Sequence, residues 1–445
     1  MKKFISMACL LLFVSAMMGQ TAADALKYRR SALAEMMIYH SEDEFGLDIY
    51  EAFLAKPFPD KYDEHGIGFE VVDNDSIANV RRNSHGLVKA EFGKNLTSAD
   101  VKRNGKALEK ILNDNEVAKF MVARWFGMPI DPDNFDISTA HFSVDLIQER
   151  GQYNASDLDV ELAKQTARGV AALADAGEEL LSNTFMLISD MTYVTAEEKA
   201  ALAKGIMSFL GEVVDGALGT NIGSQVANLG GDIADSFTGF TVKTNSYLFQ
   251  LEWNDSIAAI FYNNYYTSVP NADKVLAFLF DTTTFRMKYV AHEYEYNSKS
   301  VIKGSYDRKE LVKMVCTRSI DKNIAALGRS YEDFKVKTPV YSVEVDDKGH
   351  TTGYTAKIGM KEGVTEKTKF QVVERRMDPE TGKTSYKYIA TVMPQKGKVW
   401  DNRYNAVTEK SEGSTLTATT LKKVSGGEIY SGMLLIEGKY RKVKE

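Results

Sequence analysis

The N-terminal segment determines which residues can fold as the mature protein. Lys2 and Lys3 precede an apolar run over residues 4–18, and small residues follow up to Ala23. This order is typical of a secretory signal peptide, and the run is shorter than the ~20 residues that span a bilayer as a helix. We therefore expect residues 1–23 to be removed and no transmembrane helix to remain. The mature chain is expected in the periplasm or associated with the outer membrane.

Two other ways of processing the leader stay open. Cleavage after Ala25 gives nearly the same product, whereas lipidation at Cys9 would leave an anchored chain. After cleavage near Ala23, Cys316 is the one cysteine that remains of two. A single cysteine cannot form a disulfide within its own chain, so packing of the core must stabilise the mature protein.

Charge and composition narrow the class of protein. Removal of Lys2 and Lys3 lowers the formal net charge from −6 to −8. Such a charge disfavours nucleic acid and anionic lipid as partners. The chain is 44% hydrophobic and 11% aromatic, and its 445 residues correspond to two to four domains of ~100–200 residues. We predict an α+β, multi-domain protein.

Residues 24–182 are predicted to form a mostly helical N-terminal domain. The helices expected there cover residues 25–39, 44–54, 117–126 and 156–181, together with one that a capping box opens at Thr97. A short strand is expected over residues 68–72.

Residues 183–335 are predicted to form a mixed α+β domain. Strands are expected over residues 184–194, 240–253 and 284–296, and a helix over residues 308–327. A helical hairpin is expected as an insertion over residues 195–238. Its apolar stripes, which are candidate interaction residues, comprise Ile206, Phe209, Val213, Val226, Leu229 and Ile233. The hairpin could pack within the domain, dock a partner or contact a membrane.

Residues 336–445 are predicted to form a small all-β domain. The expected strands cover residues 340–345, 369–374, 385–392, 415–421 and 433–436, with turn sequences between them. Five or six short strands in ~100 residues are typical of a small barrel of the SH3-like or OB-like type.

The motifs that resemble catalytic or metal sites each lack a required residue. His292-Glu293-Tyr294-Glu295-Tyr296 has no second histidine one helical turn away, and its alternation favours a strand. Residues 216–231 are rich in glycine, but no Gly-Lys-Ser/Thr follows them. No Gly-x-Ser-x-Gly nucleophile motif occurs. We therefore predict no catalytic residue, no metal ligand and no cofactor.

One aromatic segment is a candidate ligand site. Tyr262, Tyr265 and Tyr266 alternate with asparagines over residues 261–266, and such side chains could stack on sugar rings and bond hydroxyl groups. Core packing is the competing interpretation.

Four segments carry a resemblance to a family of exported proteins. They are residues 150–163 (RGQYNASDLDVELA), 177–190 (GEELLSNTFMLISD), 398–403 (KVWDNR) and 424–427 (VSGG). They resemble exported proteins of Gram-negative gut bacteria to which no activity is assigned. The helix–strand sequence GEELLSNTF is similar in outline to periplasmic domains of curli-type secretion subunits. The resemblance implies a location in the cell envelope and no functional residue.

Three functions follow as hypotheses. The first is a cell-envelope protein of structural or interaction type, which binds a protein partner or a second copy of itself, with an envelope glycan as a further candidate ligand. The second is a periplasmic hydrolase acting on glycans or peptidoglycan through a carboxylate pair between the first two domains. The third is an oligomeric assembly subunit that uses the hairpin.

Overall fold

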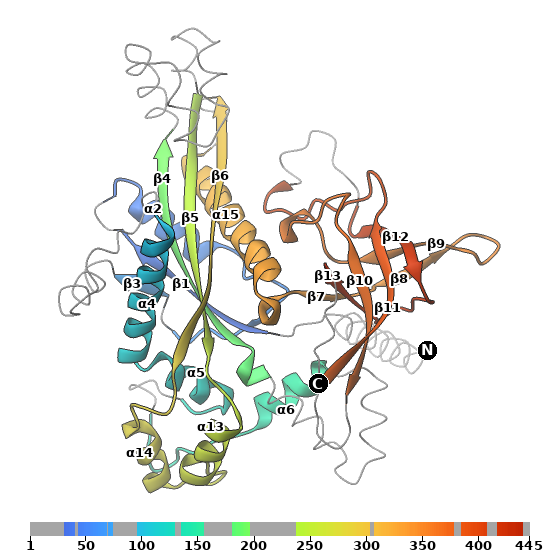
Figure 1. Ribbon diagram of the computed structural model, residues 1–445. Helices are drawn as coiled ribbons and strands as arrows, with labels where there is room; N and C mark the ends of the chain where they lie inside the picture. The colour runs from blue at the N-terminus through green and yellow to red at the C-terminus, as the bar shows by residue number, and fades with distance from the viewer. Residues whose placement is uncertain are drawn as a thin grey trace, which may run out of the picture.

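The structure, a computed structural model, describes ten segments of the chain. They are residues 31–40, 43–68, 70–73, 96–129, 135–154, 180–195, 237–302, 307–377, 384–406 and 416–438. These residues form two β-sheets and a set of helices (Figure 1). The protein is therefore α+β, as the sequence predicts, with a mixed sheet A and a curled antiparallel sheet B.

Sheet A contains six strands. They are β1 (Ala32–Tyr39), β2 (Asp63–Glu64), β3 (Val71–Asp73), β4 (Thr184–Thr195), β5 (Phe237–Leu251) and β6 (Met287–Ile302). The order is β2-β1-β4-β5-β6, and β3 also pairs with β1. The sheet is mixed because β1 and β4 pair in parallel, whereas β5 pairs antiparallel with both β4 and β6.

Strand β1 corrects the helix predicted over residues 25–39, within the part that is described. Leu33 and Met37 pack into the core on one face of sheet A, and Ala34 and Met36 pack into the core on the other. Both faces are covered, so the apolar residues form a run without polar alternation. Such a run does not distinguish a buried strand from a buried helix. Because β1 pairs with β4, residues from the first two predicted domains share one sheet.

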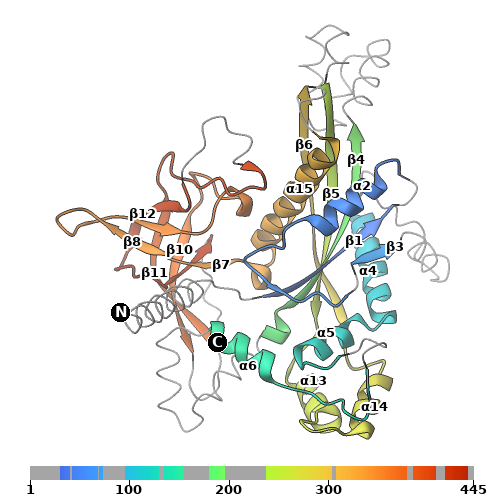
Figure 2. The same ribbon diagram turned by 180° about the vertical axis from the view of Figure 1, so that it is seen from behind.

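Helices cover both faces of sheet A (Figures 1 and 2). One face packs against α4 (Ser98–Asp114), α5 (Val117–Trp125), α6 (Asp145–Asn154), α13 (Asp255–Ile260), the π-helix η1 (Phe261–Tyr265) and α14 (Ala272–Phe280). The other face packs against α2 (Gly46–Ala55) and α15 (Arg308–Ser330). The predicted capping box is confirmed, because Thr97 Oγ1 accepts from Asp100 N and an Asp100 carboxylate oxygen accepts from Thr97 N. We call sheet A with these helices the body.

Gly105 lets α4 approach β6 closely. A Cβ atom at this position would lie 2.6–2.7 Å from three ring carbons of Tyr289. We expect Gly105→Ala to lower the free energy of unfolding by about 1–3 kcal/mol, since the ring or the helix must shift. Urea titration measures this loss. Gly66→Ala is the control, because its Cβ would meet nothing closer than 3.9 Å. Equal stability of the two variants would contradict the prediction.

Side chains of α4 also cover part of the edge of sheet A. Asn113 accepts from Met287 N at 2.8 Å and donates to Met287 O at 3.0 Å, and Glu109 accepts from Tyr289 N at 2.7 Å. These bonds occupy peptide groups of the edge strand β6 that a neighbouring strand would otherwise occupy.

Sheet B contains seven antiparallel strands. They are β7 (Lys337–Pro339), β8 (Ser342–Val345), β9 (Thr351–Ala356), β10 (Phe370–Met377), β11 (Thr384–Pro394), β12 (Thr419–Gly426) and β13 (Leu434–Glu437). The order is β7-β13-β10-β11-β12-β9-β8. Between β7 and β8, Val340 N donates to Met433 O and Tyr341 N donates to Thr355 O, both at 2.7 Å. One bent stretch thus contacts both ends of the sheet, which curls into a half-barrel.

The other predicted elements of the first two domains have mixed outcomes. The strands predicted over 184–194, 240–253 and 284–296 and the helix over 308–327 are confirmed as β4, β5, β6 and α15. The ends of the predicted hairpin are wrong, because residue 195 ends β4 and residues 237–238 begin β5. Most of the hairpin and of the helix predicted over 156–181 lies outside the described residues. No described helix is long and apolar enough to cross a membrane.

Candidate functional site

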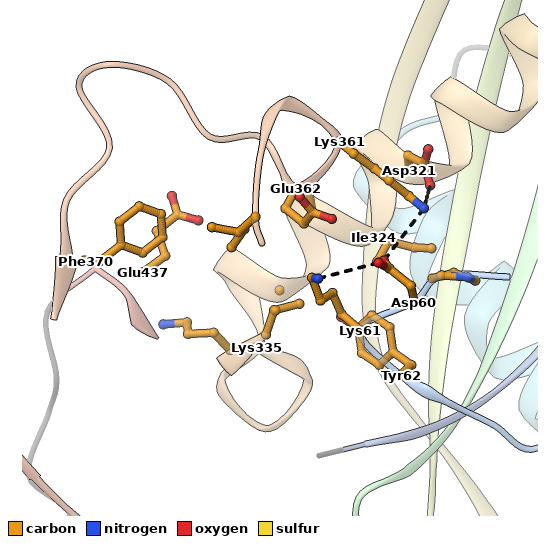
Figure 3. A pocket seen from close by; sticks show the side chains of 15 residues that line it. Asp60, Lys61, Tyr62, Asp321, Ile324, Lys335, Lys361, Glu362, Phe370 and Glu437 are labelled. Atoms are coloured by element: carbon orange, nitrogen blue, oxygen red, sulfur yellow. Dashed lines mark ion pairs between the residues drawn. The ribbon is translucent and has the colours of Figure 1, made fainter. Parts of the chain in front are cut away.

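A cavity of about 40 Å³ lies between the body and the half-barrel (Figure 3). Its lining comprises Pro59, Asp60, Lys61, Tyr62, Asp321, Ile324, Ala325, Gly328, Lys335, Val336, Ile358, Lys361, Glu362, Phe370 and Glu437. A water molecule needs roughly 10–15 Å³ of such space, so the cavity has room for a few waters. We call it the interface cavity.

The body contributes the segment after α2 and one side of α15. The prolines at 57 and 59 end α2 because proline disfavours helix at and before its own position. The chain then turns so that the ring of Tyr62 stacks on Phe334, with centroids 4.7 Å apart, and the Tyr62 hydroxyl donates to Phe334 O at 3.1 Å. Burial raises the pKa of this hydroxyl, which stays protonated.

The half-barrel contributes a short turn, η3 (Met360–Glu362), which carries Lys361 and Glu362. Glu362 Oε2 accepts from Gly359 N at 2.7 Å and from Asn402 Nδ2 at 2.9 Å. The other amide atom of Asn402, Oδ1, accepts from Lys361 N at 2.8 Å. Asn402 therefore holds both charged residues of the turn at once.

This contact gives a physical role to the segment KVWDNR (398–403). Trp400 O accepts from Met360 N at 2.9 Å, next to the two bonds of Asn402. Tyr404 follows Asn402 by two residues. Its backbone oxygen accepts hydrogen bonds from Nε and an Nη atom of Arg318 on α15, at 3.0 and 2.6 Å. The segment thus shapes the η3 turn, and the residues that follow it attach the half-barrel to the body.

Asp321 is the central charged group of the body side. Its side chain is 11% exposed and lies 3.9 Å from Lys361 Nζ. The pKa of Asp321 is raised to about 7, chiefly by burial. The nearby Glu362 and Glu35 carboxylates contribute to this rise, whereas Lys361 and Lys56 oppose it. Asp321 therefore titrates near neutral pH in the folded protein.

Two ion pairs lie among the residues that line the cavity, and one of them joins the half-barrel to the body. Lys361 of the half-barrel lies 4.0 Å from Asp60 of the body, and Lys61 lies 3.5 Å from the same Asp60 (Figure 3). Burial also raises the pKa values of Glu362 and Glu437 above the ordinary value for glutamate. The carboxyl groups that line the cavity can accordingly exchange protons with water held in it. Lys361 of the half-barrel pairs with carboxylates of the body.

The predicted ligand residues lie elsewhere, in the aromatic core under α14. Tyr265 is buried and donates to Asp281 Oδ2 at 3.0 Å. Tyr262 and Tyr266 are half-buried and pack with their ring centroids 5.3 Å apart, each also against the fully buried Phe126. None of the three lines the interface cavity. The candidate interaction residues of the hairpin, from Ile206 to Ile233, lie outside the described residues.

Sheet A holds a second polar group of residues. His40 Nε2 lies 2.7 Å from Asp190 Oδ1, and His292 Nε2 lies 3.0 Å from Asn245 Oδ1. Burial lowers the pKa of His292 to about 4, so this ring is neutral at pH 7. Residue 292 belongs to β6, which confirms the strand predicted for this segment. No group of three or more His, Cys, Asp or Glu side chains in the described part is placed to hold a metal ion.

Sequence reasoning missed Asp321, Lys361 and Glu362. One signal was present for Asp321, because it follows the buried Thr317 by four residues and precedes the buried Ile324 by three. A carboxylate at helical spacing within a buried stripe indicates either a partner or a shifted pKa.

No protein-family model matches the chain, and no curated protein matches it. The site is therefore interpreted from its own residues.

Proposed function

We propose that the protein is an exported cell-envelope protein of interaction type, in which the body holds the half-barrel in a fixed orientation as a binding module. One observation carries this proposal. The interface cavity has room for a few waters, and its polar groups pair with one another across the contact. Such a cavity suits a contact between two parts of one molecule better than a pocket for an organic substrate.

Two finer proposals accompany it. The half-barrel is a small barrel of the SH3-like or OB-like type, which is supported by the bent stretch that contacts both ends of sheet B. The signal-like leader supports export to the periplasm or the outer membrane, and the family resemblance agrees with it. A protein partner or an envelope glycan is the proposed ligand class.

Fractionation of the native cells tests the proposal of export. We expect the protein in the periplasmic or outer-membrane fraction, with an intact mass that corresponds to loss of residues 1–23 or 1–25. Crosslinking in intact cells should then give a complex that contains this chain. A cytoplasmic protein with its leader intact would overturn the proposal.

A hydrolase is the second candidate, and the paired carboxyl groups favour it. Asp321 and Glu362 both have raised pKa values and line the same cavity, and a raised pKa is one property that a general acid needs. Peptidoglycan and glycan digestion by the wild type and by Asp321→Asn and Glu362→Gln tests it. Turnover that both variants abolish without unfolding would favour the enzyme, and absence of turnover would exclude this pair.

A further inference from the structure

A covalent connection and a pair of hydrogen bonds attach the half-barrel to α15 of the body. The connection runs from α15 through the short turn η2 (Glu332–Phe334) into β7. The hydrogen bonds are those from Arg318 to Tyr404 O. Arg318 precedes the end of α15 at Ser330 by 12 residues, so the two attachments are about 18 Å apart along the helix. Two attachments on one helix define an axis about which the half-barrel can turn.

Between these attachments, the η3 turn is held to the body by a weak charge contact. Lys361 Nζ lies 3.9 Å from Asp321 Oδ1 and 4.0 Å from Asp60 Oδ1 (Figure 3). Both distances are too long for a hydrogen bond. Lys361 is therefore shared between two carboxylates and hydrogen-bonded to neither. Because such an ion pair contributes little to stability, it offers little resistance to the separation of η3 from residues 59–62.

The carboxyl group of Asp321 lacks a hydrogen-bond donor among the residues that the structure describes. Its side chain is largely buried, and the cations that act on it there are those of Lys361 and Lys56. The carboxyl groups of Glu362 and Glu35 lie near it as well, and the buried Oε1 of Glu35 has no hydrogen-bond partner. A buried ionised carboxyl group without donors is costly, so the closed contact favours the protonated form of Asp321.

Further charged residues lie around the same cavity. They are Lys61, Arg329, Lys335 and Glu437. Burial raises the pKa of Glu437, while Arg329 and Lys335 oppose this rise, and burial also raises the pKa of Glu362. With Asp321, three carboxyl groups of one interface therefore retain their protons to a higher pH than they would in water.

We propose that the half-barrel turns about α15 as the pH rises through neutrality, so that η3 separates from residues 59–62 and the interface cavity opens. Opening lets water reach the carboxyl groups and removes the cost of ionising them in a buried place. The protein then has a closed state at low pH and an open state at high pH. The inference rests on the proposed function, because the orientation that the body gives to the half-barrel is the property that pH regulates.

The direction of the change follows from proton binding. The closed state keeps the proton of Asp321 up to about pH 7, whereas a carboxyl group in water loses it near pH 4. The open state therefore binds fewer protons between these values, and a rising pH favours it. Below about pH 4 the group is protonated in both states, so its titration gives no preference for opening.

The distance between two spin labels, measured by double electron–electron resonance on the mature chain, tests the proposal. Leu54→Cys on α2 and Lys367→Cys after η3 carry the labels, since both positions are exposed, whereas the native Cys316 is fully buried. We expect one narrow distance distribution at about pH 5. At about pH 8 a second, longer distance should appear, with the ratio of open to closed molecules at least ~10-fold higher, because Asp321 ionises within this range.

The outcomes distinguish this inference from the proposed function. One narrow distribution at both pH values would overturn the opening and leave the half-barrel in a fixed orientation. A broad distribution at both pH values would overturn the fixed orientation and, with it, the inference.

Substitutions in the labelled protein identify the group that responds. Asp321→Asn should show the short distance alone at both pH values, because asparagine has no proton to lose. Glu437→Gln is a second variant and should reduce the opening at about pH 8 in part. Asp347→Asn, at an exposed turn, is the control and should open as the wild type does. Circular dichroism checks that each variant is folded. Opening of Asp321→Asn to the extent of the wild type would overturn the proposal.

Discussion

Asp321→Asn is expected to stabilise the protein above pH 7 by a few kcal/mol and to change the dependence of its stability on pH. The carboxyl group of Asp321 has a pKa of about 7 in the folded protein, because it is buried beside Glu362 and Glu35. The ordinary value for aspartate is about 3.9. Each unit of pKa difference corresponds to about 1.4 kcal/mol, so ionised Asp321 in the folded state is costly even with Lys361 beside it.

The direction of the effect follows from proton binding. Between about pH 4 and pH 7 the unfolded chain has lost the proton of Asp321 and the folded protein retains it. The folded state therefore binds more protons, and its stability falls as the pH rises through this window. The stabilisation of the folded state by protonated Asp321 is fully present below about pH 4 and is lost once the pH passes about 7. Asparagine has no proton to lose, so the variant lacks this decline.

Urea unfolding of both proteins at intervals from about pH 4 to pH 8 measures the prediction. The difference in free energy of unfolding between the variant and the wild type should grow steadily with pH and level off near pH 8. Other titrating groups are common to both proteins and cancel in the difference. Asp347→Asn, at an exposed turn, is the control. If the free energies of unfolding of Asp321→Asn and the wild type changed in parallel with pH, the raised pKa of Asp321 would be contradicted.

The sequence indicates which segments form strands better than it indicates which strands pair with each other. Local patterns reveal β4, β5 and α15, because β-branched and aromatic content, helical spacing and capping are encoded within a few residues. Strand β1 is hidden, because its position between β2, β3 and β4 buries both of its faces. Its pairing with β4 joins residues about 150 positions apart, and no local pattern encodes such a contact.

The candidate site was hidden for a related reason. Lys361 and Glu362 lie in a turn whose sequence is unremarkable, and Asp321 lies in a helix that also has a polar side. Their chemistry arises only when the half-barrel meets α15. The role of the segment KVWDNR depends on two hydrogen bonds of Asn402 to residues about 40 positions earlier in the chain. The tyrosines at 262, 265 and 266, which the sequence suggests as ligand residues, pack in a core.

Asn402→Asp is expected to loosen the attachment of the η3 turn and to cost about 2–4 kcal/mol of stability near pH 8. The substitution preserves the shape of the side chain and the acceptor for Lys361 N. It replaces the donor that faces Glu362 Oε2 by an oxygen, so two carboxyl groups share one partly buried site. Either one of the two carboxyl groups stays protonated, or the two negative charges repel each other. The pKa values of both carboxyl groups therefore rise.

This loss should depend on pH, in contrast to a purely steric change in the same turn. Groups with raised pKa values destabilise the folded state as the pH rises, so Asn402→Asp should be close to wild type at about pH 5 and clearly weaker at about pH 8. Gly359→Ala places a Cβ atom 2.3 Å from Trp400 O and should cost stability equally at both values. Asn264→Asp, at an exposed position in η1, is the control for the added charge. If Asn402→Asp lost the same stability at both pH values, Glu362 would not be the group that responds, and the interface cavity would be held by shape rather than by charge.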